Sequence, residues 1–277
     1  MNRFGFIDSS GIIKKDRFFG AGLLVIKNVG CLNNKLAKNY QSAYNAAREN
    51  KNIVINKLID SGKEDEVVNM LRNNKRFEMK FDNLKLSLQP HYKEMIDIFF
   101  SDGENRFSAM VIDKDESNFD ETYINDAWEA YTGYSATLVL REMRNLQKDK
   151  LCLIVDEITK PRSKALSLEE TFLSKLKFKT EKDPVVDFAN IFGTISIESH
   201  SNTLMQLTDV LLGAVMYDFK KKNGLISTMI ERKKEELVKK IRETISVDSL
   251  ARESFTKHSP AYFSVFEAKW NQKNNAR

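Results

Sequence analysis

Three apolar runs along the chain each end in an aspartate. Residues 4–8, 107–113 and 151–157 are short and rich in aromatic and β-branched side chains, which predicts buried strands. Their carboxylates belong to Asp8, Asp113 and Asp156. Because open α/β sheets carry their chemistry at the carboxyl ends of strands, these aspartates are candidate site residues. A turn cap is the other interpretation of Asp8, since two serines and a glycine follow it.

The pattern between these runs predicts further strands and helices. Residues 18–26 form an apolar run whose short connection predicts antiparallel pairing with the first strand. Residues 75–81 alternate between apolar and charged side chains, which predicts a strand with Glu78 and Lys80 on one face. A short strand is expected at 192–197, and three- and four-residue spacings predict helices within 33–72 (two or three), at 91–100 and 118–148, from 166, and at 230–245. Continuous apolar strands separated by helices are typical of a parallel sheet covered on both faces.

A nearly all-apolar helix is expected at residues 204–215, and Asp209 lies inside it. Burying an unpaired carboxylate costs several kcal/mol, so this group needs a metal, a cation, hydrogen-bond donors or a proton. A structural role, with the carboxylate bound by neighbouring backbone or an arginine, is the alternative to a functional one.

Composition describes an ordinary globular protein. The chain has 277 residues, 42% of them hydrophobic, and a formal charge of +5, which permits a polyanionic partner without requiring one. Cys31 and Cys152 lack metal-site spacing, so we expect reduced thiols and a cytoplasmic protein. We expect no signal peptide, and no membrane contact because no apolar run reaches the roughly 18 residues that span a bilayer. One domain with helical additions is predicted, and the lysine-rich residues 33–72 are its most basic surface.

Four segments together resemble a known family. They are Phe6-Ile7-Asp8-Ser9-Ser10-Gly11, Phe77-Glu78-Met79-Lys80-Phe81, Leu153-Ile154-Val155-Asp156-Glu157, and residues 204–213 with Leu-Met-Gln-Leu-Thr-Asp. In this order, over roughly residues 4 to 220, they resemble an uncharacterised prokaryotic family of ribonuclease-H-like predicted nucleases. That family typically opens with Tyr-x-Asp-Glu-Ser-Gly and closes with a Leu-Gln-x-x-Asp helix.

The resemblance implies a fold and a domain plan. The fold is an α/β, ribonuclease-H-like mixed sheet flanked by helices. The domain would cover residues 1–222, with a helical insertion at 33–72, and residues 223–277 would form a helical extension.

The resemblance also implies an acidic cluster. Its members are Asp8, Glu78, Asp156 and Asp209, with Lys80 and Gln206 beside them. Ser9 stands where the family usually has glutamate, which implies a weakened or altered site if that glutamate helps to hold a metal.

Converging carboxylates repel one another, and divalent cations relieve that repulsion. Magnesium or manganese is therefore expected, in a two-metal hydrolysis of phosphodiesters. In this hypothesis Asp8 bridges the ions and Asp156 and Asp209 flank them. Glu78 adds a ligand or positions water, and Lys80 neutralises the scissile phosphate. Asp113 competes with Asp156 for the third position, because the sequence does not say which strand neighbours the first.

Two functions from different classes remain. One is a nuclease acting on DNA or RNA, and the other is an inactive module that binds nucleic acid or a protein, with oligomerisation or partner binding through residues 33–72. His200 is interpreted either as a proton shuttle or as a local cap. Acyl transfer is disfavoured because no Gly-x-Ser-x-Gly elbow accompanies Ser199 and His200. No Walker or dinucleotide glycine motif occurs either.

Overall fold

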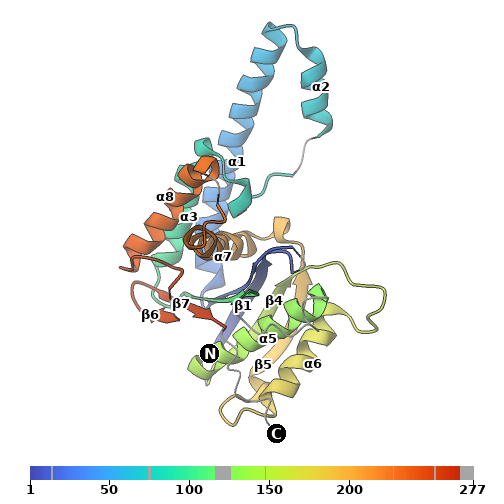
Figure 1. Ribbon diagram of the computed structural model, residues 1–277, viewed down its shortest axis with the longest axis vertical. Coiled ribbons are helices and arrows are strands. Elements are labelled where there is room, and N and C mark those ends of the chain that lie inside the picture. Colours follow the sequence, from blue (N-terminus) through green and yellow to red (C-terminus); the bar gives the residue numbers. More distant parts are fainter. Residues whose placement is uncertain are drawn as a thin grey trace.

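The computed structural model of the chain is built on one seven-stranded mixed sheet with the order β5-β4-β1-β2-β3-β7-β6 (Figure 1). The structure describes residues 1–13, 15–73, 76–115, 126–146, 148–226, 228–252 and 254–268, without the side chains of 228–232. The strands are β1 (Asn2–Ser10), β2 (Phe18–Ile26), β3 (Arg106–Asp113), β4 (Lys150–Asp156), β5 (Ile191–Ile197), β6 (Phe255–Lys257) and β7 (Tyr262–Glu267).

Strand directions confirm the predicted mixed sheet. β1 pairs antiparallel with β2, as its short connection predicted, and parallel with β4. β2 is also antiparallel to β3, whereas β4 and β5 are parallel. The sheet is therefore mixed, as predicted. A short connection reverses the chain between β1 and β2, whereas the helical residues 27–105 connect β2 to β3.

Helices cover both faces of the sheet. On one face α5 (Ala127–Leu146) and α6 (Leu168–Thr180) bury a cluster around Ile7, Leu23 and Val155. On the other, α7 (Thr203–Lys222), α3 (Gln89–Phe100) and α8 (Thr228–Thr244) join the base of α1 (Val29–Asp60) over Phe6, Leu24 and Val111. Short 3-10 turns lie at Phe81–Asn83 (η1), Leu86–Leu88 (η2), Phe188–Asn190 (η3) and Ser199–Ser201 (η4). Among the described residues, none of the helices has both the length and the apolar character needed to cross a membrane.

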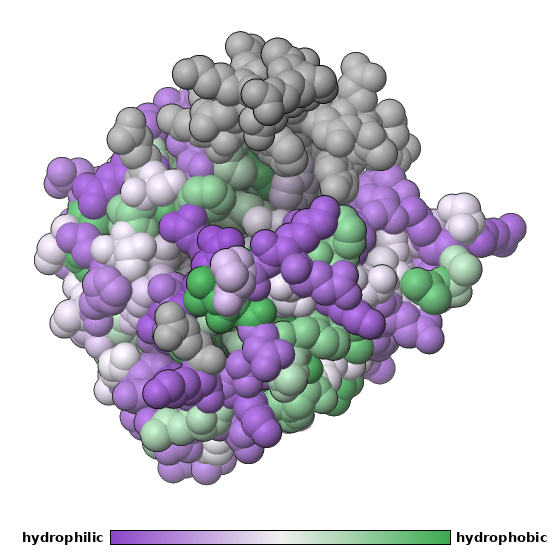
Figure 2. All heavy atoms as spheres, turned by 90° about the horizontal axis from the view of Figure 1, so that it is seen from below, coloured by the Kyte–Doolittle hydropathy of each residue, from purple (hydrophilic) through white to green (hydrophobic). Residues whose placement is uncertain are grey.

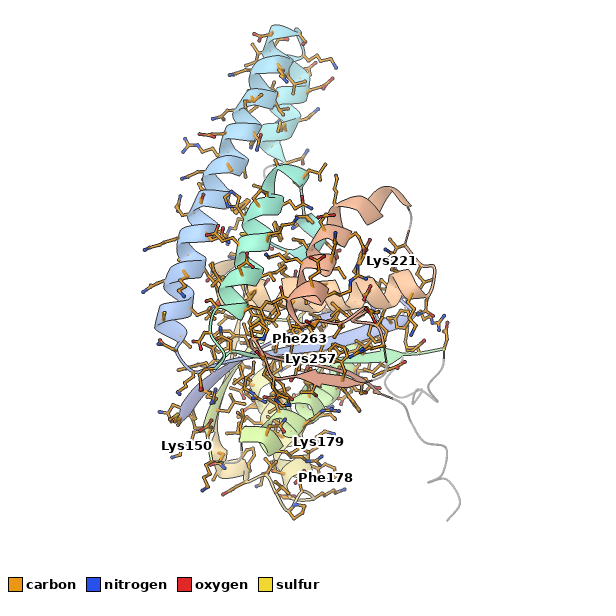
Figure 3. The ribbon with its side chains drawn as sticks, turned by 90° about the vertical axis from the view of Figure 1, so that its left-hand side faces the viewer. Lys150, Phe178, Lys179, Lys221, Lys257 and Phe263 are labelled. Atoms are coloured by element: carbon orange, nitrogen blue, oxygen red, sulfur yellow. The ribbon has the colours of Figure 1, made fainter. Side chains whose placement is uncertain are left out.

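The predicted helical insertion forms a projecting pair of helices, α1 and α2 (Glu64–Arg72). The buried residues of α1 are Leu32, Leu36, Asn39 and Ala43, all in its first half. The outer half of α1 and all of α2 extend away from the sheet (Figures 1 and 3). We call residues 44–72 the arm.

The strand predicted at 75–81 is wrong. Within its described part, residues 76–80 belong to no helix or strand, and η1 begins at Phe81; Lys75 lies outside the described residues. The alternation itself persists, since Met79 and Phe81 are buried. Side chains of α7 supply the hydrogen bonds that a neighbouring strand would have supplied: the Met79 N–H donates to Gln206 Oε1 (2.9 Å) and the Phe81 N–H to Asp209 Oδ1 (2.7 Å).

The predicted helical extension at 223–277 is wrong in its second part. α8 is helical, but β7 pairs with β3 inside the main sheet and β6 pairs with β7. Phe263 and Val265 are fully buried because alternate residues of β7 point into the core. The boundary predicted at residue 222 therefore divides one sheet. Of the helix predicted at 118–148, residues 118–125 and 147 lie outside the described residues, as does Trp270.

Candidate functional site

Three of the predicted aspartates come from neighbouring elements. Asp8 on β1 and Asp156 on β4 follow the paired residues Ile7 and Val155, so they occupy adjacent positions on two parallel strands. α7, which packs across β1 and β2, contributes Asp209. The chain thus brings residues 8, 156 and 209 to one end of β1.

The competing Asp113 lies elsewhere. β3 is separated from β1 by β2, and Asp113 pairs there with Arg17 through three hydrogen bonds, the shortest of them 2.6 Å between Nη2 and Oδ2. Asp156 therefore is the aspartate that neighbours Asp8, and Asp113 has a structural partner.

The surroundings of Asp8 destabilise its ionised carboxylate. Its side chain is buried, and this burial raises the pKa of its carboxyl well above the usual range. Repulsion from Asp209 and Asp156 raises the pKa further, while the Ser9 N–H (2.7 Å to Oδ1) and the Lys80 ammonium oppose the shift.

Burial raises the carboxyl pKa of Asp209 and Asp156 as well. Burial raises the pKa of Asp209 to about 6, against the hydrogen bond from Phe81 and the charge of Lys80. Burial also raises the pKa of Asp156, although Lys80 and hydrogen bonds from Ser199 and the Glu157 N–H lower it. The charge of Lys80 thus lowers the pKa of all three aspartates.

Lys80 is a cation held among acids. Burial alone would lower the pKa of its ammonium, but Glu78, Asp209 and Asp156 together raise it above the usual value. Its Nζ lies 3.4 Å from Glu78 Oε2. Glu78 is therefore the ion-pair partner of Lys80, and this pairing competes with its predicted use as a metal ligand.

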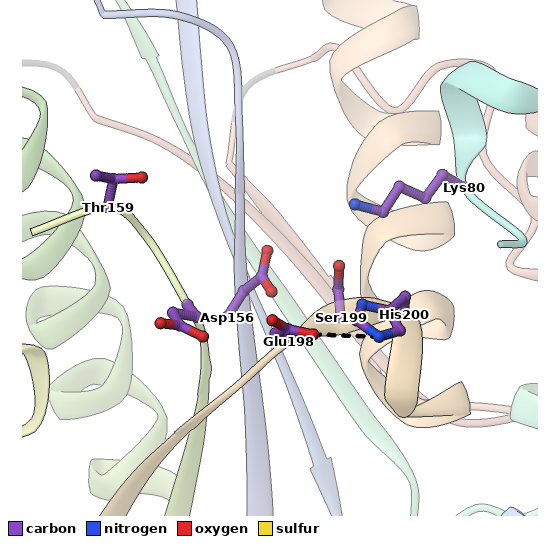
Figure 4. A pocket seen from close by; sticks show the side chains of 7 residues that line it. Lys80, Asp156, Thr159, Glu198, Ser199 and His200 are labelled. Atoms are coloured by element: carbon purple, nitrogen blue, oxygen red, sulfur yellow. Dashed lines mark ion pairs between the residues drawn. The ribbon is translucent and has the colours of Figure 1, made fainter. Parts of the chain in front are cut away.

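A cleft of about 360 Å³ opens beside this cluster (Figure 4). Asp156, Glu157, Glu198 and His200 line it, and Lys80 reaches toward it from the opposite wall. Ser199 and Thr159 complete the lining. His200 Nε2 lies 3.1 Å from Glu198 Oε2 and also contacts Arg76. The cleft therefore has a wall of carboxylates at the β4 and β5 ends, with the Lys80 ammonium facing it.

Supporting residues that the sequence did not reveal hold this arrangement. The Tyr131 hydroxyl, fully buried under β1 and β4, lies 3.4 Å from the Ile7 carbonyl oxygen and 3.3 Å from that of Asp156. Ser199 forms hydrogen bonds with Asp156. No sequence motif predicted the contacts of Tyr131 or of Ser199. Gln206 is different: it lies three residues before Asp209, so helical spacing places both on one face toward residues 79–81.

The donor set suits a hard divalent cation, because carboxylate oxygens are the ligands that Mg²⁺ and Mn²⁺ prefer. Within the described part of the chain, however, no three His, Cys, Asp or Glu side chains are arranged to hold a metal ion. The structure brings Asp8, Asp156 and Asp209 into electrostatic contact without aligning them as ligands.

Comparison of this chain with protein-family models, curated proteins and solved structures finds no match. Any assignment of function therefore depends on the residues and geometry described above.

Proposed function

We propose that this protein is a metal-dependent nuclease of ribonuclease-H-like fold that hydrolyses phosphodiester bonds of DNA or RNA. The observation that carries the proposal is the burial of Asp8, Asp156 and Asp209 side by side, which raises the pKa of all three carboxyl groups. Burying three carboxylates costs the fold free energy that Lys80 offsets in part, whereas a cation-binding site needs them.

The strand arrangement supports the fold assignment. The order β5-β4-β1-β2-β3, with β2 alone running against the others, is that of a ribonuclease-H-like sheet. Such a sheet places the end of its first strand beside the end of its fourth. In this chain those ends carry Asp8 and Asp156.

Each residue has a role in the proposal. Asp8, Asp156 and Asp209 hold Mg²⁺ or Mn²⁺, and Glu78 contributes if Lys80 releases it to pair with a substrate phosphate. The bound metal would supply activation of water and stabilisation of the leaving oxygen. Lys80 neutralises charge on the phosphate, and His200 lines the cleft through which the backbone would enter, with Arg76 in contact with it.

A second candidate is a ribonuclease-H-like module without turnover that binds nucleic acid or a protein. Two observations favour it. Lys80 already compensates the acids without a metal, and no three-ligand arrangement occurs in the described residues. Ser9, in place of the family's glutamate, points in the same direction.

Metal titration followed by a nuclease assay separates the two. We expect calorimetry to detect Mg²⁺ or Mn²⁺ binding by the wild type and Asp248→Asn, an exposed control, but not by Asp8→Asn or Asp209→Asn. Labelled single- and double-stranded DNA and RNA then report cleavage. Metal binding that is unchanged by Asp8→Asn and by Asp209→Asn would contradict the nuclease proposal. Equal cleavage by all four proteins would show that a contaminant cleaves the substrate.

A further inference from the structure

The edge strand β5 is defended only in part: a register shift against β4 lies near its start, and Glu169 of α6 binds the Ser196 N–H near its end. β5 is the outermost strand beside β4, and its sequence Ile-Phe-Gly-Thr-Ile-Ser-Ile contains no charge and no proline. Natural proteins place charges, prolines or short strands at such edges to prevent pairing with another chain. β6, at the opposite edge, is only three residues long and carries Lys257, so it follows that rule.

β5 also exposes apolar side chains. Phe192 is 52% and Ile195 55% exposed. β5 and α6 lie in the lower part of the molecule in Figure 1, and the view from below in Figure 2 has hydrophobic patches among hydrophilic side chains.

We propose that β5 pairs antiparallel with β5 of a second copy of this chain, about a two-fold axis at Thr194. This register pairs Thr194 with Thr194 of the second copy and sets exposed Ile195 over Gly193, which leaves space for it.

The free backbone groups fit this register. The Ser196 N–H donates to Glu169 Oε1 (3.1 Å) and so points away from β4. Because direction alternates along a strand, the N–H group of Thr194 also points outward, whereas Phe192 lies in the register shift of β5. Thr194 can exchange two hydrogen bonds with its counterpart while Glu169 keeps the Ser196 N–H.

The charges of α6 fit the same axis. Glu169 faces β5, and Leu173 and Lys177 follow at four-residue steps on that side, with Glu170 adjacent. α6 connects two parallel strands and therefore runs opposite to β5. Thr194 lies two residues before Ser196, which is about 6.6 Å along the strand. The same distance along α6 corresponds to about four residues after Glu169. The point on α6 that lies beside Thr194 is therefore midway between Glu170 and Lys177.

Two copies of α6 would therefore meet antiparallel, with Glu170 of each near Lys177 of the other. Such self-complementary charge is what a two-fold interface requires, and it distinguishes a second copy from a foreign strand or a nucleic acid. The dimer does not depend on the proposed nuclease activity.

Sedimentation velocity over a concentration series tests the dimer. We expect a reversible dimer for the wild type, and a monomer for Ile195→Lys, which puts a charge into the interface. Phe178→Lys is the matched control, since Phe178 is 58% exposed on a different face of α6 and should leave the dimer intact (Figure 3). Lys177→Glu should weaken the dimer more at low salt than at high salt, unlike Lys182→Glu.

Covalent trapping tests the register. Directly opposed residues of a hydrogen-bonded pair lie about 5.5 Å apart at Cα, within disulfide range. In a Cys31→Ser background, Thr194→Cys should form a disulfide-linked dimer under mild oxidation, whereas Phe178→Cys should not. A wild type that is monomeric at every concentration, or a dimer indifferent to Ile195→Lys, would overturn the proposal. Binding of labelled nucleic acid that Ile195→Lys abolishes in a monomeric protein would also overturn it.

Discussion

At the scale of single residues, the site is defined by unfavourable charge. Asp209 has a carboxyl pKa of about 6, against an ordinary value of 3.8, chiefly because it is buried. The folded protein therefore holds a proton on Asp209 more tightly than the unfolded chain does. Stability falls as pH rises from about 4 through 6, and the full penalty persists above that window.

Asp209→Asn removes this penalty while its amide oxygen can still accept the Phe81 N–H. In EDTA at pH 8 we expect the variant to gain up to about 3 kcal/mol in free energy of unfolding, converting the shift at about 1.4 kcal/mol per pKa unit. The gain should shrink toward pH 4, where the carboxyl is protonated in the folded protein and about half protonated in the unfolded chain. Chemical denaturation across pH measures this, with Asp248→Asn as an exposed control; a gain that did not vary with pH would contradict the electrostatic cause.

Gly213 fixes the position of the residue that binds Asp209. A Cβ added at Gly213 would lie 2.4 Å from both Cβ and Cγ of Phe81, so α7 and residues 76–81 could not approach as they do. We expect Gly213→Ala to cost about 1 to 3 kcal/mol in stability by overpacking. Gly30→Ala, with no atom within 4 Å of the added Cβ, is the control and should be neutral or stabilising. Thermal unfolding of both variants checks the contrast.

At the scale of elements, sequence patterns gave the type of element more reliably than its neighbours. Alternation at residues 75–81 did predict which side chains are buried, but helix α7 and not a strand satisfies the backbone. Alternating apolar and charged residues show that one side of the segment is buried and the other is not. They do not show which element binds the backbone N–H groups of the segment. Glu78 and Lys80 share a face as expected, yet they pair with each other.

The arm differs from the base of the helix that carries it. Residues 32–43 of α1 supply all of its buried side chains, whereas in the arm Val67 of α2 alone is classed as buried among the described residues. We expect backbone amides of residues 47–60 to exchange with deuterium faster than those of 32–43, because local opening there exposes little apolar surface. Hydrogen exchange with mass spectrometry measures both segments in one experiment. Equal protection along α1 would indicate that the arm is covered in solution.

At the scale of the whole molecule, the C-terminal strand closes the core. Phe263 of β7 is fully buried and contacts the rings of Phe107 and Phe100. β7 covers the outer side of β3, so the last segment cannot be an independent extension.

Phe263→Ala should therefore destabilise the entire chain by about 3 to 5 kcal/mol, as expected for an aromatic ring removed from a core. Phe178→Ala, which removes an exposed ring, should change stability by less than about 0.5 kcal/mol. Denaturant unfolding followed by fluorescence and circular dichroism should give one coincident transition in each variant. An early, separate transition of the C-terminal segment in Phe263→Ala would contradict a shared core.

The sequence by itself determined the apolar strands, most helices, and the identity of the carboxylates that terminate or interrupt apolar segments. These follow from local periodicity and from the cost of burying charge, which act within a few residues. Only the tertiary structure decided that Asp156 and not Asp113 neighbours Asp8, that residues 76–80 dock on α7, and that β7 completes the sheet. Strand order and long-range contacts depend on how separate segments pack, and a local pattern holds no information about which distant segment will be its partner.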